Sequence, residues 1–150
     1  MRSDVGGVVS SPMASTEKTR AALTRAAESA LRDGEHVVTM LPYTHVPKRP
    51  KGPLGKVKDG IYQSYRRYRP LVLTDQRVLI FDTGRTPFPR YLLADFPTAD
   101  VEVISTTPAS FGTTEVVLEL PGEGPVPFVA GRKDQEGLDM LIVALGGVSR

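Results

Sequence analysis

Residues 70–85 read PLVLTDQRVLIFDTGR and contain two short apolar runs separated by a polar break. The runs at 71–74 and 78–81 have the β-branched and apolar composition of buried strands, and 75–77 has the composition of a tight turn. This stretch therefore predicts a β-hairpin, and the rest of the chain can be interpreted outward from it.

Further strands are predicted on both sides of the hairpin. They cover residues 36–43, 91–93, 101–105, 116–120 and 126–130. Alternation is clearest around the fourth of these, where Val116, Leu118 and Leu120 fall on one face of a strand. Proline and glycine pairs between the runs are typical of turns.

A helix is predicted at each end of the strand region. The first covers about 16–32, with Ser15 as its N-cap and an alanine-rich face. That face contains Leu23, Ala26, Ala27, Ala30 and Leu31. The second begins after Asp134, a candidate N-cap, and its apolar stripe has the spacing i, i+3, i+4, i+7. The stripe consists of Leu138, Leu141, Ile142 and Leu145.

The order of elements is therefore a helix, about seven short strands and a second helix. Parallel strands need crossovers of a dozen or more residues, which this spacing does not provide. We expect a mainly β fold with flanking helices, an antiparallel seven-stranded barrel or sandwich capped by the C-terminal helix. The predicted division is a flexible tail at 1–14, an N-terminal helix at 15–34 and a β domain at 35–147.

Composition limits the classes of function. The chain has 150 residues, 40% of them hydrophobic and 24% charged, which is typical of one globular domain. It contains no cysteine, which excludes disulfides, thiol catalysis and thiolate metal sites. The longest apolar run, 141–145, is far below the roughly 20 residues that span a bilayer. With no recognisable signal peptide, we expect a cytoplasmic location.

Positive charge is concentrated in one segment. Residues 48–70 carry eight basic groups and one acidic group, Asp59, a net charge of +7, whereas 71–150 carry six basic and eleven acidic groups, a net charge of −5. The basic residues are Lys48, Arg49, Lys51, Lys56, Lys58, Arg66, Arg67 and Arg69. We interpret them as an anion-binding patch for a membrane surface or an acidic protein partner. The alternatives are a merely solvated loop, nucleic-acid binding and homo-oligomerisation.

Three tyrosines lie among these cations, at positions 62, 65 and 68. Their spacing fits one stripe of a helix, and it also fits a strand in which Tyr65 points away from the other two. Pro70 biases Arg69 toward an extended backbone, but the pattern alone leaves both conformations open for residues 61–69.

Signals for catalysis are weak. In one continuous strand, His36 and His45 have opposite parity and lie on opposite faces. Glu115 and Glu119 share a strand face but are about 13 Å apart, farther than a glycosidase pair. The chain has no glycine-rich phosphate loop, nucleophile elbow or metalloprotease helix. We therefore expect a protein that is not an enzyme, with no cofactor and no metal.

The stretch PLVLTDQRVLIFDTGR, with Thr-Asp-x-Arg at its turn, resembles the paired strands of bacterial pleckstrin-homology-like (PH-like) domains. LRDGEHVV at 31–38 and the C-terminal helix extend the similarity to about residues 31–146. The resemblance implies a bent antiparallel barrel of about seven strands plugged by a helix, without catalytic residues. The N-terminal helix is an addition to this minimal fold.

The same resemblance implies a binding role. PH-like domains are associated with membrane surfaces, peptide ligands or self-assembly. In those that bind phosphoinositides, lysines and arginines around the loop after the first strand hold the phosphates, and the basic segment has a similar place here. Lys56-Val57-Lys58 departs from the eukaryotic pattern, which ends in arginine. The expectation is weak binding of anionic ligands through this loop, at the inner membrane face or in the cytoplasm.

Overall fold

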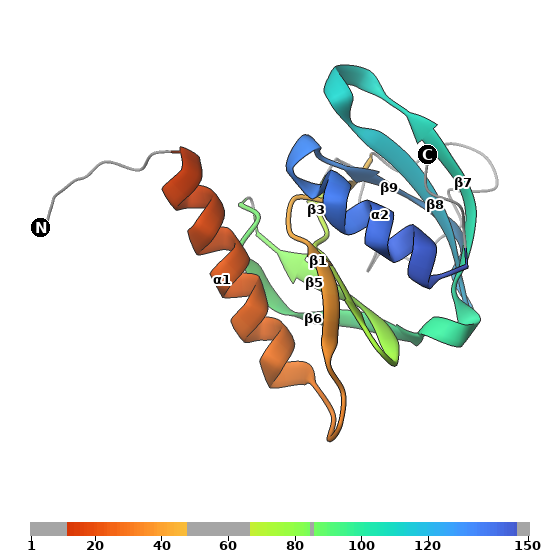
Figure 1. Cartoon of the computed structure of the whole chain (residues 1–150), viewed down its shortest axis with the longest axis horizontal. Helices are drawn as coiled ribbons and strands as arrows, with labels where there is room; N and C mark the ends of the chain where they lie inside the picture. Colours follow the sequence, from red (N-terminus) through yellow and green to blue (C-terminus); the bar gives the residue numbers. More distant parts are fainter. Residues whose placement is uncertain (1–11, 48–66, 85, 147–150) are drawn as a thin grey trace, which may run out of the picture.

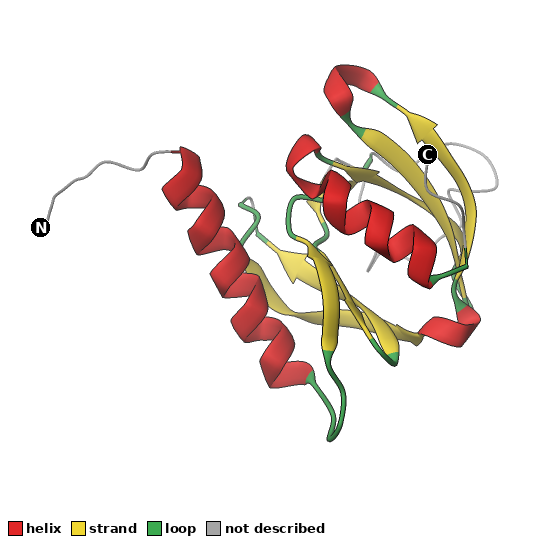
Figure 2. Ribbon diagram, in the orientation of Figure 1, coloured by secondary structure: helices red, strands yellow, loops and turns green. Residues whose placement is uncertain are grey.

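The computed structural model describes residues 12–47, 67–84 and 86–146. It is mainly β, with two antiparallel sheets and a helix at each end (Figures 1 and 2). The elements are α1 (Pro12–Ala30), β1 (Val37–Leu41), β2 (His45–Val46), β3 (Arg67–Tyr68), β4 (Leu71–Thr74), β5 (Arg77–Thr83), β6 (Pro89–Pro97), η2 (Thr98–Asp100), β7 (Glu102–Pro108), η3 (Ser110–Gly112), β8 (Thr114–Leu120), β9 (Gly124–Ala130), η4 (Arg132–Asp134) and α2 (Gln135–Ala144).

The two sheets are linked by strands that run from one into the other. The four-stranded sheet has the order β1-β4-β5-β6, and the five-stranded sheet has the order β3-β2-β9-β8-β7. β1 is followed after three residues by β2 in the other sheet, and β3 is followed after two residues by β4. The antiparallel arrangement predicted from the sequence is confirmed, while the described strands form two sheets and not a closed barrel.

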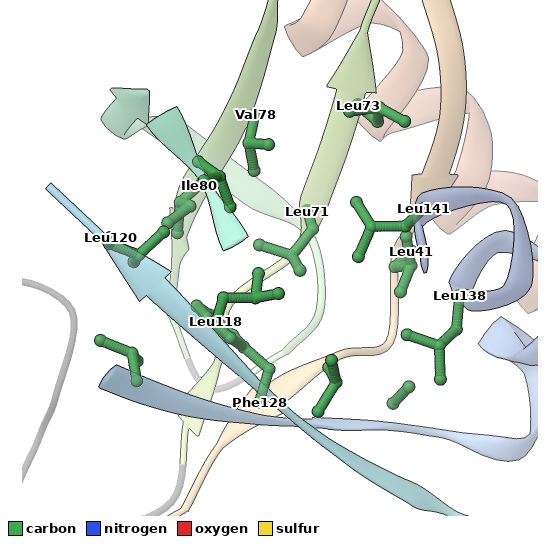
Figure 3. Packing of buried hydrophobic residues seen from close by; sticks show 14 of the residues in the cluster. Leu41, Leu71, Leu73, Val78, Ile80, Leu118, Leu120, Phe128, Leu138 and Leu141 are labelled. Carbon is green, nitrogen blue, oxygen red and sulfur yellow. The ribbon is translucent and has the colours of Figure 1, made fainter. Parts of the chain in front are cut away.

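The main core lies between the sheets. The alternation predicted for β8 is confirmed, because Val116, Leu118 and Leu120 are fully buried. In Figure 3 the β8 and β9 side chains face those of β4 and β5, and α2 closes the side. From this helix Leu138, Leu141 and Ile142 enter the core, as its periodicity predicts.

A second, smaller core lies on the outer face of the four-stranded sheet. There Leu23 and Ala27 of α1 pack against Val72, Leu79 and Phe81. The sheet is thus covered on both faces, which explains why every residue of β4 and β5 is buried. The predicted alanine face is confirmed, but the predicted start is wrong. The helix begins at Pro12, before Ser15, and proline is favoured in the first helical turn.

The C-terminal helix lies unusually close to β1. A Cβ built on Gly137 would be 2.5 Å from the carbonyl oxygen of Met40 and 3.3 Å from the hydroxyl of Thr39. Glycine lowers helix propensity at this position, but it is the residue that lets α2 reach the edge strand. The apparent weak point in the helix is therefore a requirement of packing.

The first predicted strand is interrupted. Residues 36–43 were expected to form one strand, whereas β1 ends at Leu41 and the chain bends before β2. Pro42 lies in this bend, and proline has no backbone N–H with which to continue a sheet ladder. In the part of the chain that the structure describes, neither helix has the length and apolar character needed to cross a membrane.

Candidate anion-binding region

The basic segment begins and ends at two paired strands. His45 lies opposite Tyr68, and Val46 lies opposite Arg67, at the edge of the five-stranded sheet. The connection from β2 to β3 therefore starts and finishes at neighbouring points of one sheet edge. Of the predicted anion-binding residues, Lys48, Arg49, Lys51, Lys56, Lys58 and Arg66 lie outside the described residues, and Arg67 belongs to β3.

Arg69 does not face solvent, so its assignment to an exposed anion patch is wrong. Its side chain is 0% exposed, and Nη1 lies 3.2 Å from Oδ1 of Asp82. The same Nη1 donates to the carbonyl of Tyr68 at 3.0 Å. A buried guanidinium needs an acidic partner because desolvation of an isolated charge is costly. Arg69 therefore pairs with the carboxylate of Asp82 instead of contributing to a surface.

Tyr68 resolves part of the open question about residues 61–69. It lies in β3, so the end of this stretch is a strand. Its ring packs edge-on against the ring of His45, with centroids 6.4 Å apart and an interplanar angle of 85°. Tyr62 and Tyr65 lie outside the described residues.

The turn between β5 and β6 lies beside the point where the basic segment returns. The Thr83 hydroxyl donates to the Tyr68 carbonyl at 3.0 Å. Asp82, next to Thr83, holds Arg69 on one side and Arg90 of β6 on the other, with Arg90 Nη1 3.6 Å from Oδ2. The Arg90 side chain is 57% exposed. This arrangement places a solvent-facing cation close to the base of the basic segment.

Sequence reasoning did not assign function to this turn. Its two prolines, Pro87 and Pro89, are among the proline and glycine pairs that predict turns between the strands, yet Phe88 and Tyr91 are both large hydrophobic side chains exposed to solvent. An aromatic residue between two prolines was the available signal. The register of β5 with β6, which places Tyr91 opposite Asp82, was not visible in the sequence.

Within the stretches that carry the PH-like resemblance, Glu35, Thr74 and Arg77 form a buried polar cluster. Arg77 donates to Glu35 from Nε at 2.9 Å and from Nη2 at 2.7 Å, and it also reaches Asp95 at 2.8 Å. Arg77 Nη2 further donates to the carbonyl of Ala30 at the end of α1. Glu35 also accepts from the Thr74 hydroxyl. The cluster fastens α1 to the β4–β5 hairpin, so we assign these residues a structural role.

Electrostatics in this cluster favour the ionised forms. The hydrogen bonds from Arg77 lower the pKa of Glu35 from 4.5 to about 2, against burial, which raises it. The hydrogen bonds to Glu35 raise the pKa of Arg77 above its ordinary value. At the turn, the backbone N–H of His36 lowers the pKa of Asp75, and the imidazole of His36 contributes from 3.4 Å.

Asp134 takes a different role from the predicted helix cap. It occupies the N-cap position of α2 but makes no side-chain hydrogen bond to the helix. Its Oδ2 accepts from the Tyr43 N–H at 2.8 Å and from the Thr44 hydroxyl at 3.0 Å, in the bend between β1 and β2. Oδ1 is buried without a hydrogen-bond partner. Burial raises the pKa of Asp134 from 3.8 to about 6.

The other candidates for chemistry do not converge. His36 contacts Asp75 beside β1, whereas His45 lies in β2 against Tyr68, so the two imidazoles have separate surroundings. Within the described ranges, no three histidine, aspartate or glutamate side chains are grouped in a way that could hold a metal.

A pocket lies between η2 and the end of α2. Its lining residues are Thr98, Ala99, Asp100, Val101, Glu102, Ala144, Leu145 and Gly146. The charged residues among them are Asp100 and Glu102, so this pocket does not suit an anionic ligand.

Comparison with known proteins gives no relative from which a role can be transferred. No protein-family model matches the chain, and no curated protein matches it.

Proposed function

We propose that the chain is a non-enzymatic PH-like module that binds anionic membrane surfaces weakly through the segment between β2 and β3. The observation that carries the proposal is the concentration of charge. With Arg69 buried, residues 48–68 still hold seven basic groups against Asp59, a net charge of +6. The strands at which the segment begins and ends, β2 and β3, pair with each other at one sheet edge.

The strand order supports the PH-like part of the proposal. β1 with β2, and β3 with β4, are consecutive pieces that bend from one sheet into the other. Counted in this way, the nine strands in the described part of the chain make seven segments, followed by a helix that packs into the core between the sheets. This is the order of strands and helix that the sequence resemblance implies.

The expected strength follows from the charge. Each lysine or arginine near an anionic leaflet contributes about 1 kcal/mol, so six net charges give at most about 6 kcal/mol. Attachment of this strength is reversible and is weakened by salt, because screening shortens the range of surface charges.

The test is sedimentation with phosphatidylcholine vesicles, with and without phosphatidylserine. We expect binding only to the anionic vesicles in about 0.1 M salt, and its loss in about 1 M salt, where the Debye length falls from about 10 Å to about 3 Å. Equal binding to both vesicle types, or no binding, would contradict the proposal.

A matched pair of variants separates local charge from total charge. Replacing Lys56, Lys58, Arg66 and Arg67 by alanine removes four charges from the basic segment. The control replaces Lys18, Arg25, Arg132 and Lys133, four exposed cations elsewhere on the molecule. The first variant is expected to lose binding and the second to keep most of it. Equal losses would mean that net charge alone is responsible.

The alternatives are a protein-interaction or self-assembly module and a nucleic-acid-binding module. Assembly through the alanine face of α1 gains no support, because that face packs against the protein's own sheet. Light scattering that showed a discrete oligomer, unchanged in the basic-segment variant, would favour assembly through another surface. The net charge of −5 over residues 71–150 disfavours a duplex, and oligonucleotide binding without a salt-dependent slope would exclude that role.

A further inference from the structure

Two aromatic side chains are exposed to solvent where the turn between β5 and β6 leads into β6. Phe88 is 43% exposed and Tyr91 is 53% exposed. Pro87 and Pro89 flank Phe88, and proline fixes the backbone φ angle on both sides of it. Exposed aromatics on a stiffened turn lose little conformational freedom when they enter a binding surface.

This turn and the base of the basic segment form one surface region. Thr83 at the end of β5 donates to Tyr68, the residue after Arg67. Thr83 is also the register partner of Pro89, which adjoins Phe88. The contacts therefore lead directly from the end of the basic segment to the exposed aromatics.

Arg90 gives this region a cation of its own. The guanidinium carbon of Arg90 lies 5.8 Å from the centroid of the Tyr91 ring. Its Nη1 lies 3.6 Å from Oδ2 of Asp82. Asp82 is already paired with the buried Arg69 at 3.2 Å, so one carboxylate serves two guanidinium groups. Arg90 is exposed, and its guanidinium has N–H donors besides those on Nη1 that can donate to an anionic oxygen.

We infer that Phe88 and Tyr91 enter the headgroup layer of an anionic membrane while Arg90 contacts the lipid phosphates. This inference rests on the proposed function and adds the surface that orients the protein on the bilayer. Tyrosine and other aromatic rings favour the headgroup level, and a positive field beside exposed apolar groups favours an anionic membrane over a neutral one.

Phe111, the most exposed aromatic among the described residues, provides a natural control. It is 90% exposed in the turn between β7 and β8. β9 pairs antiparallel with β2 at His45 and Val129, so it runs away from the basic segment. The C-terminal end of β9 leads to Arg132, and the side chain of Arg132 packs against Gly112, the residue after Phe111. Phe111 therefore lies at the end of the sheet remote from the proposed membrane surface.

The chain contains no tryptophan, so one introduced tryptophan reports on a single site. The variants Phe88→Trp and Phe111→Trp are mixed with phosphatidylcholine vesicles, with and without phosphatidylserine, and binding is measured by sedimentation. We expect the emission of Phe88→Trp to shift to the blue and to be quenched by brominated lipid on anionic vesicles. The emission of Phe111→Trp is expected to stay unchanged.

The double variant F88A/Y91A measures the contribution of the aromatics. It is expected to bind anionic vesicles about tenfold more weakly than the unmodified chain, because two half-exposed rings no longer leave water. F111A is expected to bind normally. Circular dichroism of each variant is the check that the fold is retained.

The outcomes separate the two proposals. Sedimentation without a change in Phe88→Trp emission would overturn the aromatic insertion and leave electrostatic attachment standing. A shift in Phe111→Trp in place of Phe88→Trp would also overturn it, since the opposite end would then face the membrane. Absence of sedimentation would overturn the proposed function, and the insertion with it.

Discussion

Replacing Glu35 by glutamine removes the negative charge from a buried ion pair while nearly preserving the shape of the side chain. The pKa depression from 4.5 to about 2 corresponds to about 3 kcal/mol of stabilisation at neutral pH. Breaking a buried pair from one side costs about 3–5 kcal/mol. Arg77 keeps Asp95 and the carbonyl of Ala30, so we expect the lower end of this range, a loss of about 3 kcal/mol.

The pH dependence gives the prediction a second signature. Because the folded state lowers the pKa of Glu35, its stabilisation is complete above about pH 4.5 and is lost as the pH falls toward 2. Urea denaturation at pH 7 is expected to show the full difference between Glu35→Gln and the unmodified chain. At pH 3 the difference is expected to be roughly half as large, with unchanged m-values.

Glu28→Gln is the matched control, since Glu28 is exposed on α1. Its expected effect on the free energy of unfolding is within about 0.5 kcal/mol. A loss below about 1 kcal/mol in Glu35→Gln, or a loss of the same size at both pH values, would refute the reasoning that the Glu35–Arg77 pair joins α1 to the hairpin.

Three further predictions test other features of the fold. Gly137→Ala is expected to lower the free energy of unfolding by about 1–3 kcal/mol despite its better helix propensity, because the new methyl group would collide with the Met40 carbonyl; a stabilised protein in urea denaturation would contradict this. Burial raises the pKa of Asp134 from 3.8 to about 6, so the free energy of unfolding is expected to increase by up to about 3 kcal/mol as the pH falls from above 6 toward 4. Urea denaturation of the unmodified chain should show this increase as a higher midpoint, and Asp134→Asn should not show it. Phe111 has a backbone φ of 59°, and its side chain is exposed and has few contacts to lose. Phe111→Gly is therefore expected to raise the thermal midpoint, because it relieves about 1 kcal/mol of backbone strain. A lowered midpoint would show that the ring packs against the protein in solution.

Local periodicity was enough to predict most elements from the sequence. The hairpin at 70–85, the buried face of β8 and the apolar stripe of α2 all depend on residues within a few positions of one another. A period of two or of 3.6 residues directly specifies which side chains share a face. These predictions are confirmed because each element depends on residues that are close together in the sequence, and the hydrophobic pattern is read over the same short distance.

Contacts between distant residues were not predictable in this way. Arg77 was assigned to a turn, but it begins β5 and pairs with Glu35, 42 positions earlier. Arg69 was assigned to a surface because its neighbours are basic, and its partner Asp82 became visible only once β3 and β5 were placed together. Asp134 had the spacing of a helix cap, yet it bonds to the bend at Tyr43, 91 positions away.

The candidate site likewise has one part that depends on residues close together in the sequence and one part that depends on distant contacts. Its charge could be read directly from composition, because a local excess of lysine and arginine needs no structure to be counted. The aromatic part could not, since Phe88 and Tyr91 become neighbours of the basic segment only through the hydrogen bond from Thr83 to Tyr68 and the register of β5 with β6.

The position of α1 has a practical consequence for anyone dissecting this protein. A fragment starting at residue 35, where the β region begins, would lack the helix that covers Val72, Leu79 and Phe81. The uncovered sheet would expose a continuous hydrophobic surface, which would favour aggregation during expression. Useful truncations should therefore begin upstream of Pro12, so that the helix and sheet are produced as one folding unit.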